Sequence, residues 1–129
     1  MPSPAVLDTS AVLALFFEEQ GSEVVSELLD HATLLSTVNL TEIHIKLIER
    51  GIPPEQAWTG IVGLGSEFSP FSAEQARIAA ELIASTRPYG LSLGDRACLA
   101  LAAHYRATVY TTDRAWANLS LGTKIEVIR

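Results

Sequence analysis

Four acidic side chains stand at positions from which they could act on one substrate. Asp8 and Asp113 each come just after a short apolar run, while Glu42 and Asp95 lie near the start of segments with helical spacing. Convergent carboxylates repel one another and are costly unless a cation neutralises them. Oxygen ligands without His or Cys suit Mg²⁺ or Mn²⁺, which polarise a phosphoryl oxygen and lower the pKa of a bound water. The pattern therefore predicts metal-dependent hydrolysis of a phosphodiester bond.

Helix capping is the alternative interpretation of the same acids, because Asp and Glu are favoured in the first turn of any helix. Asn39-x-x-Glu42 and Ser92-x-x-Asp95 both fit capping boxes. Asp8 or Asp113 could each serve as an N-cap. The sequence holds eleven Glu and only four Asp, three of which belong to this set. Capping explains acids at helix starts but does not explain the use of scarce Asp at strand ends.

The segments that must position these acids alternate between short apolar runs and longer helical patterns. This alternation predicts an α/β fold of three α/β/α layers, with a central, mainly parallel sheet of four to five strands. Ligands bind beyond the carboxyl ends of parallel strands, so we expect the four acids at one edge of the sheet. Strands are expected at residues 5–7, 33–37, 66–71, 108–111 and 124–128. Helices are expected at residues 10–19, 22–30, 40–50, 54–65, 72–85 and 93–105, with a loop at 87–90 and a helical turn at 113–118.

Length and composition fit one domain that spans residues 1–129. A chain of this size with 48% hydrophobic residues builds a core of its own, so disorder is excluded. Cys98, the only cysteine, lies in an apolar run and is expected to be buried, as are Phe16, Phe17 and Trp58 for the most part. The apolar stretch at 11–17 is too short to span a bilayer and is a poor signal peptide. We expect a soluble cytoplasmic protein with no membrane partner.

The formal net charge of −6 argues, taken alone, against a nucleic-acid partner, because phosphate binding usually shows as a basic patch. Metal binding by the acids changes this interpretation. Two divalent ions would bring the formal charge from −6 to −2 and make the site locally attractive to phosphate. Any affinity for RNA is therefore expected to depend on the metal.

Four motifs in order resemble the PIN domain family, and the resemblance covers the whole chain. They are Val6-Leu7-Asp8-Thr9-Ser10-Ala11, the midway Glu42, Leu91-Ser92-Leu93-Gly94-Asp95-Arg96-Ala97 and Tyr110-Thr111-Thr112-Asp113. Within the family, the chain is most similar to VapC toxins of bacterial and archaeal toxin–antitoxin pairs. The resemblance implies a Mg²⁺- or Mn²⁺-dependent ribonuclease on a three-layer α/β/α fold.

The resemblance also implies roles for the acids and for partners. Asp8 and Asp95 would be the principal metal ligands, Asp113 would complete the metal site, and Glu42 would ligate or orient the metal-bound water. The implied partners are an RNA substrate and a cognate small antitoxin, whose tail often blocks such a site with a basic side chain. The resemblance further implies a homodimer.

Four residues beside the acids have two interpretations each. Ser10 and Thr112 could bind metal waters or phosphate, or could simply form turns. Arg96 and Arg114 directly follow Asp95 and Asp113, and could contact RNA phosphate or form surface ion pairs.

Other function classes fit the sequence less well. An aspartyl-phosphate phosphotransferase needs two acids within three residues after its first strand, and Ser10 stands in the second place. A phospho-receiver module needs a lysine near its acceptor, and the only lysines, Lys46 and Lys124, are badly placed. A catalytically silent PIN-like module that binds RNA or protein remains the open alternative.

Overall fold

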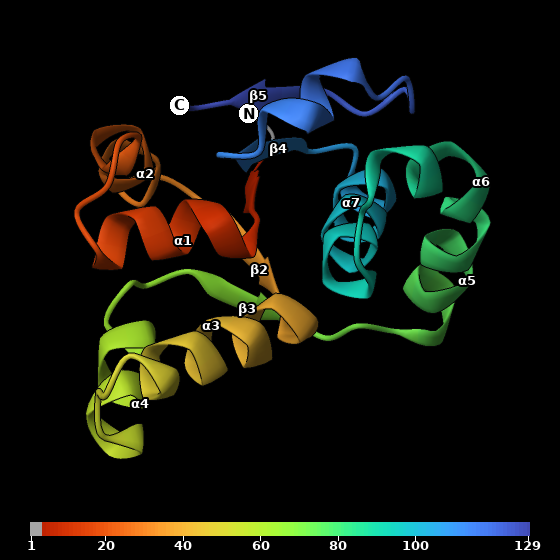
Figure 1. The fold of residues 1–129 in the computed structure, drawn as a ribbon. Helices are drawn as coiled ribbons and strands as arrows, with labels where there is room; N and C mark the ends of the chain where they lie inside the picture. The colour runs from red at the N-terminus through yellow and green to blue at the C-terminus, as the bar shows by residue number, and fades with distance from the viewer. Residues whose placement is uncertain (1–3) are drawn as a thin grey trace.

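A parallel sheet of five strands forms the centre of the computed structural model, which describes residues 4–129 (Figure 1). The strand order is β3-β2-β1-β4-β5, and all four strand pairs are parallel, as the sequence predicts. In the middle of the sheet, Val6 of β1 is paired with Leu34 of β2 on one side and with Val109 of β4 on the other. The strands are β1 (Ala5–Leu7), β2 (Thr33–Ser36), β3 (Glu67–Ser69), β4 (Thr108–Thr111) and β5 (Ile125–Val127).

Helices cover both faces of the sheet because alternate strand residues point to opposite sides. Leu7 and Leu35 pack against the helices α1 to α4, whereas Val6 and Val109 pack on the side of α7. Figure 1 shows α1 and α2 on one side of the strands and α5, α6 and α7 on the other. The helices are α1 (Thr9–Phe16), α2 (Ser22–Leu28), α3 (Thr37–Glu49), α4 (Pro54–Val62), α5 (Ala73–Glu81), α6 (Ile83–Thr86) and α7 (Leu93–Tyr105), with 3-10 helices η1 (Arg87–Tyr89) and η2 (Arg114–Asn118).

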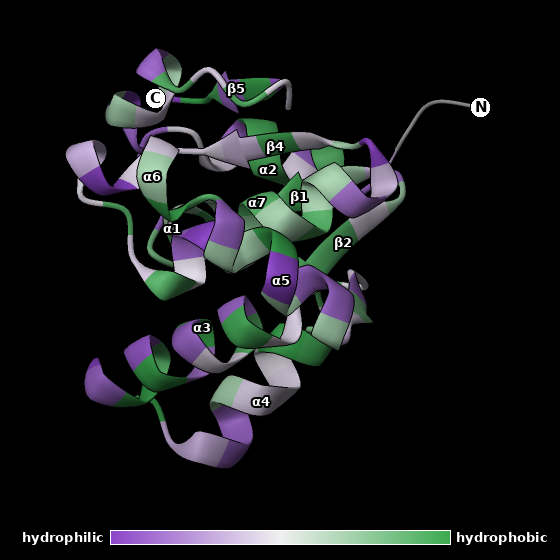
Figure 2. Cartoon of the chain, turned by 90° about the vertical axis from the view of Figure 1, so that its right-hand side faces the viewer, coloured by the Kyte–Doolittle hydropathy of each residue, from purple (hydrophilic) through white to green (hydrophobic). Residues whose placement is uncertain are grey.

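Helix α7 is the most deeply buried helix of the fold and forms much of the core on its side. Every residue from Ala97 to Ala102 is buried, and the run is coloured hydrophobic in Figure 2. Alanines and Cys98 alternate here with Leu99 and Leu101, which lets the helix approach the sheet closely. Burial of Cys98 is confirmed. No helix in the described part of the chain is long and apolar enough to cross a membrane.

Several boundaries differ from the prediction, and the following differences have local physical reasons. Helix α3 begins at Thr37, earlier than expected, because the Ser36 hydroxyl accepts a hydrogen bond from the Val38 amide and caps the helix. Helix α1 ends at Phe16, and the backbone leaves helical geometry at Glu18, whose φ is 53°. The helix expected over 72–85 is interrupted at Leu82, where ψ is −7°, and the expected loop at 87–90 is largely the 3-10 helix η1.

Trp58 corrects the expectation that it lies mostly in the core. Its side chain is 42% exposed on α4, between the rings of His44 and Phe68 at centroid distances of 5.6 and 6.0 Å. Phe16 and Phe17 are partly buried and pack against the core beneath α1. The apolar periodicity of α4 is satisfied by Ala57 and Ile61 instead, both of which are buried.

Candidate active site

The carboxyl ends of β1 and β4 bring the predicted acids to one edge of the sheet. Asp8 follows β1 directly, and Asp113 lies two residues beyond the end of β4. Glu42 lies in the second turn of α3, and Asp95 lies in the first turn of α7. The Asp8 amide donates to the Tyr110 carbonyl at 3.1 Å, which ties the ends of the two strands together.

Asp8 is the most buried acid of the set, with only 3% of its surface exposed. Its Oδ1 accepts hydrogen bonds from the Ser10 hydroxyl at 2.7 Å and the Ala11 amide at 2.8 Å, so Asp8 is also the N-cap of α1. Its Oδ2 accepts a hydrogen bond from the Thr111 hydroxyl at 2.7 Å. Burial raises the pKa of Asp8 to about 6 despite these three bonds, and the charge of Asp95 contributes to the increase.

Asp95 is both a helix cap and a member of the acidic cluster. Its Oδ2 accepts from the Ser92 amide at 2.9 Å, and its own amide donates to the Ser92 hydroxyl at 3.2 Å, which completes a capping box. Burial raises the pKa of Asp95, and the charges of Glu42 and Asp113 raise it further. The capping and cluster interpretations therefore hold at the same residue. Together with the coupling to Asp8, this makes Asp95 the electrostatic centre of the four acids.

Glu42 is held by residues that the sequence patterns did not single out for this role. Its Oε1 accepts hydrogen bonds from the Thr9 hydroxyl at 2.7 Å and from Asn39 Nδ2 at 3.2 Å. Asn39 Nδ2 also lies 3.1 Å from Thr9 Oγ1 and 3.1 Å from the Gly94 carbonyl, and so connects α1, α3 and α7. Asn39 is thus a buried bridging residue inside α3, which corrects its expected role as a capping residue.

Gly94 leaves the space that the Glu42 carboxylate occupies. A Cβ atom at position 94 would overlap both carboxylate oxygens of Glu42. The glycine is buried in the first turn of α7, next to Asp95, with no positive φ to explain its presence. Close approach of Glu42 to the α7 backbone is therefore the feature that requires glycine here.

Asp113 is the exposed member of the set. Its Oδ1 accepts a hydrogen bond from the Ala115 amide at 3.0 Å and caps η2, while its own amide donates to Thr111 Oγ1 at 3.1 Å. Thr111 thus contacts both Asp8 and Asp113 from the end of β4. Asp113 belongs to the site through this shared threonine and through its charge on Asp95.

The chemistry of this edge fits a hard divalent cation. The donors are carboxylate and hydroxyl oxygens, and none of the four acids forms an ion pair with another residue in the range 4–129. The Asn39 Oδ1 atom beside Glu42 is also buried without a hydrogen-bond partner among these residues. Within the described chain, no three Asp, Glu, His or Cys side chains form a closed metal-binding group as they stand. The edge therefore supplies suitable ligands and uncompensated charge, without a ready-made coordination sphere.

The residues beside the acids have distinct contacts. Ser10 donates to Asp8 and accepts a hydrogen bond from the Thr112 amide at 3.0 Å, so it supports the site from the first turn of α1. Arg96 Nη1 donates to the Leu91 carbonyl at 2.8 Å, and Arg114 Nε donates to the carbonyl of the last residue at 3.4 Å. Neither arginine forms an ion pair in the part of the chain that the structure describes, so that interpretation is wrong for both.

Comparison with known proteins gives one family and a consistent set of folds. A family model described as PIN domain matches residues 5–121. The fold is similar to DNA-bound VapBC from Salmonella typhimurium, with a TM-score of 0.74 and 18% identity over 98% of each chain. It is also similar to a toxin–antitoxin complex from Klebsiella pneumoniae, with a TM-score of 0.70 and 19% identity over 94% of this chain and 99% of that one. Its similarity to VapBC-5 from Mycobacterium tuberculosis has a TM-score of 0.65 and 22% identity over 99% of each chain. Comparison with curated proteins gives no match.

Proposed function

The chain belongs to the PIN domain family, and from this premise we propose that it is a metal-dependent endoribonuclease, the toxin of a toxin–antitoxin pair. One observation carries the proposal: four carboxylates without ion-pair partners in residues 4–129 meet at the carboxyl edge of the sheet, coupled through Asp95. Such an edge is where α/β sheets bind ligands. Carboxylates that remain uncompensated need a cation, and divalent metal ions are general in this family.

We assign the metal to Asp8, Asp95 and Asp113, with Mg²⁺ or Mn²⁺ as the ion. When bound, it would polarise the phosphoryl oxygen and activate a water for attack. Glu42 would orient that water, because Thr9 and Asn39 hold its carboxylate at a defined place over Gly94. Ser10 and Thr111 would fix both oxygens of Asp8, so that the buried ligand does not rotate during the reaction.

The toxin assignment rests on the shared fold and on charge. The solved structures with this fold include several toxin–antitoxin or VapBC complexes. We propose that this chain likewise pairs with a small antitoxin, whose basic side chain would enter the acidic site in place of the metal. A cytoplasmic homodimer is the expected form of the free protein.

Cleavage of RNA by the purified chain tests the enzymatic proposal. We expect cleavage with Mg²⁺ or Mn²⁺, loss of cleavage on addition of EDTA, and an inactive Asp95→Asn variant. Asp30→Asn is the matched control, because Asp30 is the one exposed aspartate outside the site, and it should retain full activity. Cleavage that survives in Asp95→Asn would contradict the metal assignment. Metal-dependent RNA binding without cleavage would instead favour the silent binding module.

The toxin proposal needs a separate test in cells. Expression of the wild-type chain should arrest growth, and expression of Asp95→Asn should not. A small DNA-binding protein encoded beside this chain should restore growth and co-purify with both forms. Robust RNA cleavage in vitro without growth arrest would favour a stand-alone processing nuclease.

A further inference from the structure

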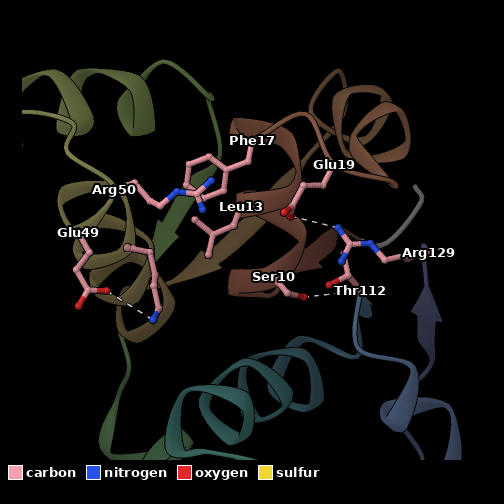
Figure 3. A pocket seen from close by; sticks show the side chains of 9 residues that line it. Ser10, Leu13, Phe17, Glu19, Glu49, Arg50, Thr112 and Arg129 are labelled. Carbon is pink, nitrogen blue, oxygen red and sulfur yellow. Dashed lines mark hydrogen bonds and ion pairs between the residues drawn. The ribbon is translucent and has the colours of Figure 1, made fainter.

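A pocket of about 410 Å³ opens directly beside the acidic edge, between α1, α3 and the C-terminal residue (Figure 3). Ser10 and Thr112 form the end of the pocket next to the acids. The Ser10 hydroxyl contacts Asp8 Oδ1 at 2.7 Å and the Thr112 amide at 3.0 Å, so the pocket and the acidic site share one wall. A ligand chain that passes the acids can therefore continue into the pocket without leaving the surface.

The pocket has a small net positive charge although the chain is acidic, because three cations and two glutamates line it. Lys46, Arg50 and Arg129 line it, which is three of the nine Lys and Arg residues in a chain of net charge −6. Two glutamates on its rim partly offset them: Lys46 Nζ lies 3.6 Å from Glu49, and Arg129 Nη2 lies 3.2 Å from Glu19. Ion pairs between exposed or half-exposed side chains such as these contribute little to stability. A phosphate group can therefore compete for both cations.

Arg50 is the cation in the pocket with the fewest competing contacts. Its guanidinium lies 3.9 Å above the centre of the Phe17 ring, and Figure 3 shows the two side chains stacked at the end away from Ser10. Arg50 forms no ion pair with any residue of the described chain. The contact with Phe17 holds the guanidinium at the pocket, where its N–H groups can contact a ligand. Guanidinium groups bind phosphate through a fork of N–H groups and also stack on unpaired bases.

We propose that this pocket binds the backbone of single-stranded RNA on one side of the cleaved bond, with Arg50 and Lys46 as phosphate contacts. The inference rests on the proposed ribonuclease activity and deepens it by assigning the direction in which the substrate leaves the acids. Positive charge beside the acids accounts for how an acidic protein holds a polyanion. A basic protein segment, the other candidate occupant, would meet like charge in the pocket.

Binding of a short fluorescent oligoribonucleotide tests the proposal without relying on cleavage. All variants are made in the Asp95→Asn background, with Mg²⁺ present, and affinity is measured across a range of salt concentrations. Lys46→Gln should weaken binding roughly three- to tenfold at low salt and reduce the slope of log K against log salt by about 0.7, the value for one phosphate contact on a single strand. Arg50→Gln should act in the same way. The double variant should reduce the slope of log K against log salt by about twice as much as either single variant.

Two matched controls separate the pocket from general charge. Lys124 is an exposed lysine with a glutamate at 3.6 Å, like Lys46, but it lies outside the pocket. Arg87 of η1, an exposed arginine without an ion pair in residues 4–129, is the corresponding control for Arg50. Lys124→Gln and Arg87→Gln should leave the salt slope unchanged.

The outcomes distinguish this inference from the proposed function. Equal effects of Lys46→Gln and Lys124→Gln, or no effect of either pocket variant, would overturn the pocket assignment even if the wild-type protein cleaves RNA. In the active background, the pocket variants should raise KM for RNA and leave kcat unchanged, because their contacts are the same in ground and transition states. Failure of the wild-type protein to cleave any RNA would overturn the function, while the salt slopes would still report on the pocket.

Discussion

The core beneath α7 and the carboxyl edge of the sheet use the same strands but bury different chemistry. In the core, Val6 and Val109 pack against Leu99 and Leu101, with every one of these side chains buried and apolar. At the edge, the buried side chains are Asp8 just beyond β1, Thr111 at the end of β4 and Asn39 on the neighbouring helix α3. Burial of apolar side chains in the core stabilises the native state, whereas burial of carboxylates at the edge destabilises it.

The pKa of Asp8 gives the approximate free-energy cost of keeping its carboxylate charged at the buried edge. A pKa of about 6 against the ordinary 3.8 corresponds to roughly 3 kcal/mol by which the native state disfavours the charged form at neutral pH. Loss of one large buried apolar side chain from a core costs a similar 2–5 kcal/mol. A site that reduces stability and keeps its charge is expected to serve binding or catalysis rather than folding.

Asp8→Asn should give the largest effect and the clearest contrast with the core. Asparagine is as good an N-cap as aspartate, so α1 should remain capped while the buried charge is removed. We expect RNA cleavage to fall roughly a thousandfold or more, about 4 kcal/mol, because a principal metal ligand is lost. Stability to denaturant without metal should rise by roughly 1–2 kcal/mol. Activity assays and urea unfolding of the same preparation measure both changes.

Metal binding provides the control for this variant. Saturating Mg²⁺ should raise the Tm of the wild-type protein, because an ion that binds only the native state stabilises it, and should have little effect on Asp8→Asn. A variant that loses both activity and stability would mean that Asp8 serves folding, and the contrast between edge and core would fail.

Leu101→Ala should do the reverse of Asp8→Asn. Leu101 is fully buried on α7 in the apolar cluster, so its truncation should reduce the free energy of unfolding by about 2–5 kcal/mol. The value of kcat/KM per folded molecule should be unchanged. Leu93→Ala is the matched control for stability, because this leucine of the same helix is 59% exposed and should change stability by less than about 0.5 kcal/mol. Loss of activity without loss of stability in Leu101→Ala would contradict the separation.

The contrast also explains which parts of the fold the sequence predicts. The strands Ala5–Leu7 and Thr108–Thr111 and the helix Leu93–Tyr105 have the predicted bounds, because apolar periodicity records burial directly. The start of α3 was less predictable, since Ser36 and Asn39 are both good capping residues and local pattern cannot choose between them. Exposure of Trp58 depends on how α4 lies against α3, which is a tertiary property.

The sequence predicts the four acids of the site, but it predicts the residues that hold their side chains less well. All four acids lie at the predicted edge, because strand ends in a parallel sheet are fixed by topology. Thr9 contacts Glu42 and Asn39 across 33 and 30 positions, and spacing along the chain does not reveal such contacts. The spacing of Asn39 and Glu42 does pair these two residues, but as a capping box rather than as the direct side-chain hydrogen bond that the structure shows. One sequence feature could have indicated that Glu42 packs closely against α7. It is Gly94 beside Asp95, a glycine inside a helix with no turn to explain it. Their roles in the reaction stay predictions until the variants are measured.

The pH dependence of the unfolding free energy should reflect the raised pKa of Asp8. The native carboxyl binds its proton with a pKa of about 6 and the unfolded one with 3.8, so between these values the native state holds more protons. The contribution of Asp8 is therefore fully present below pH 3.8 and is lost as the pH rises through 6. Without metal, the unfolding free energy of the wild-type protein should fall relative to that of Asp8→Asn by roughly 2–3 kcal/mol between pH 4 and 7. Parallel pH profiles for the two proteins would contradict the burial of a charged carboxylate.

Gly94→Ala should give the smallest effect, and it tests whether the position of the Glu42 carboxylate matters for activity. The added methyl would overlap the Glu42 carboxylate and push it away from Thr9 and Asn39.

We expect about a tenfold loss of kcat for this variant, about 1.4 kcal/mol, with metal affinity nearly unchanged. Stability should change by less than about 1 kcal/mol, because alanine is the better helix former and offsets the crowding. Gly60→Ala in α4 is the matched control, since its methyl would meet only the Phe16 ring at 3.2 Å, far along the chain from the acids, and should leave kcat intact. If Gly94→Ala keeps full activity, Glu42 does not act from the position in which the structure holds it, and the three aspartates alone must account for catalysis.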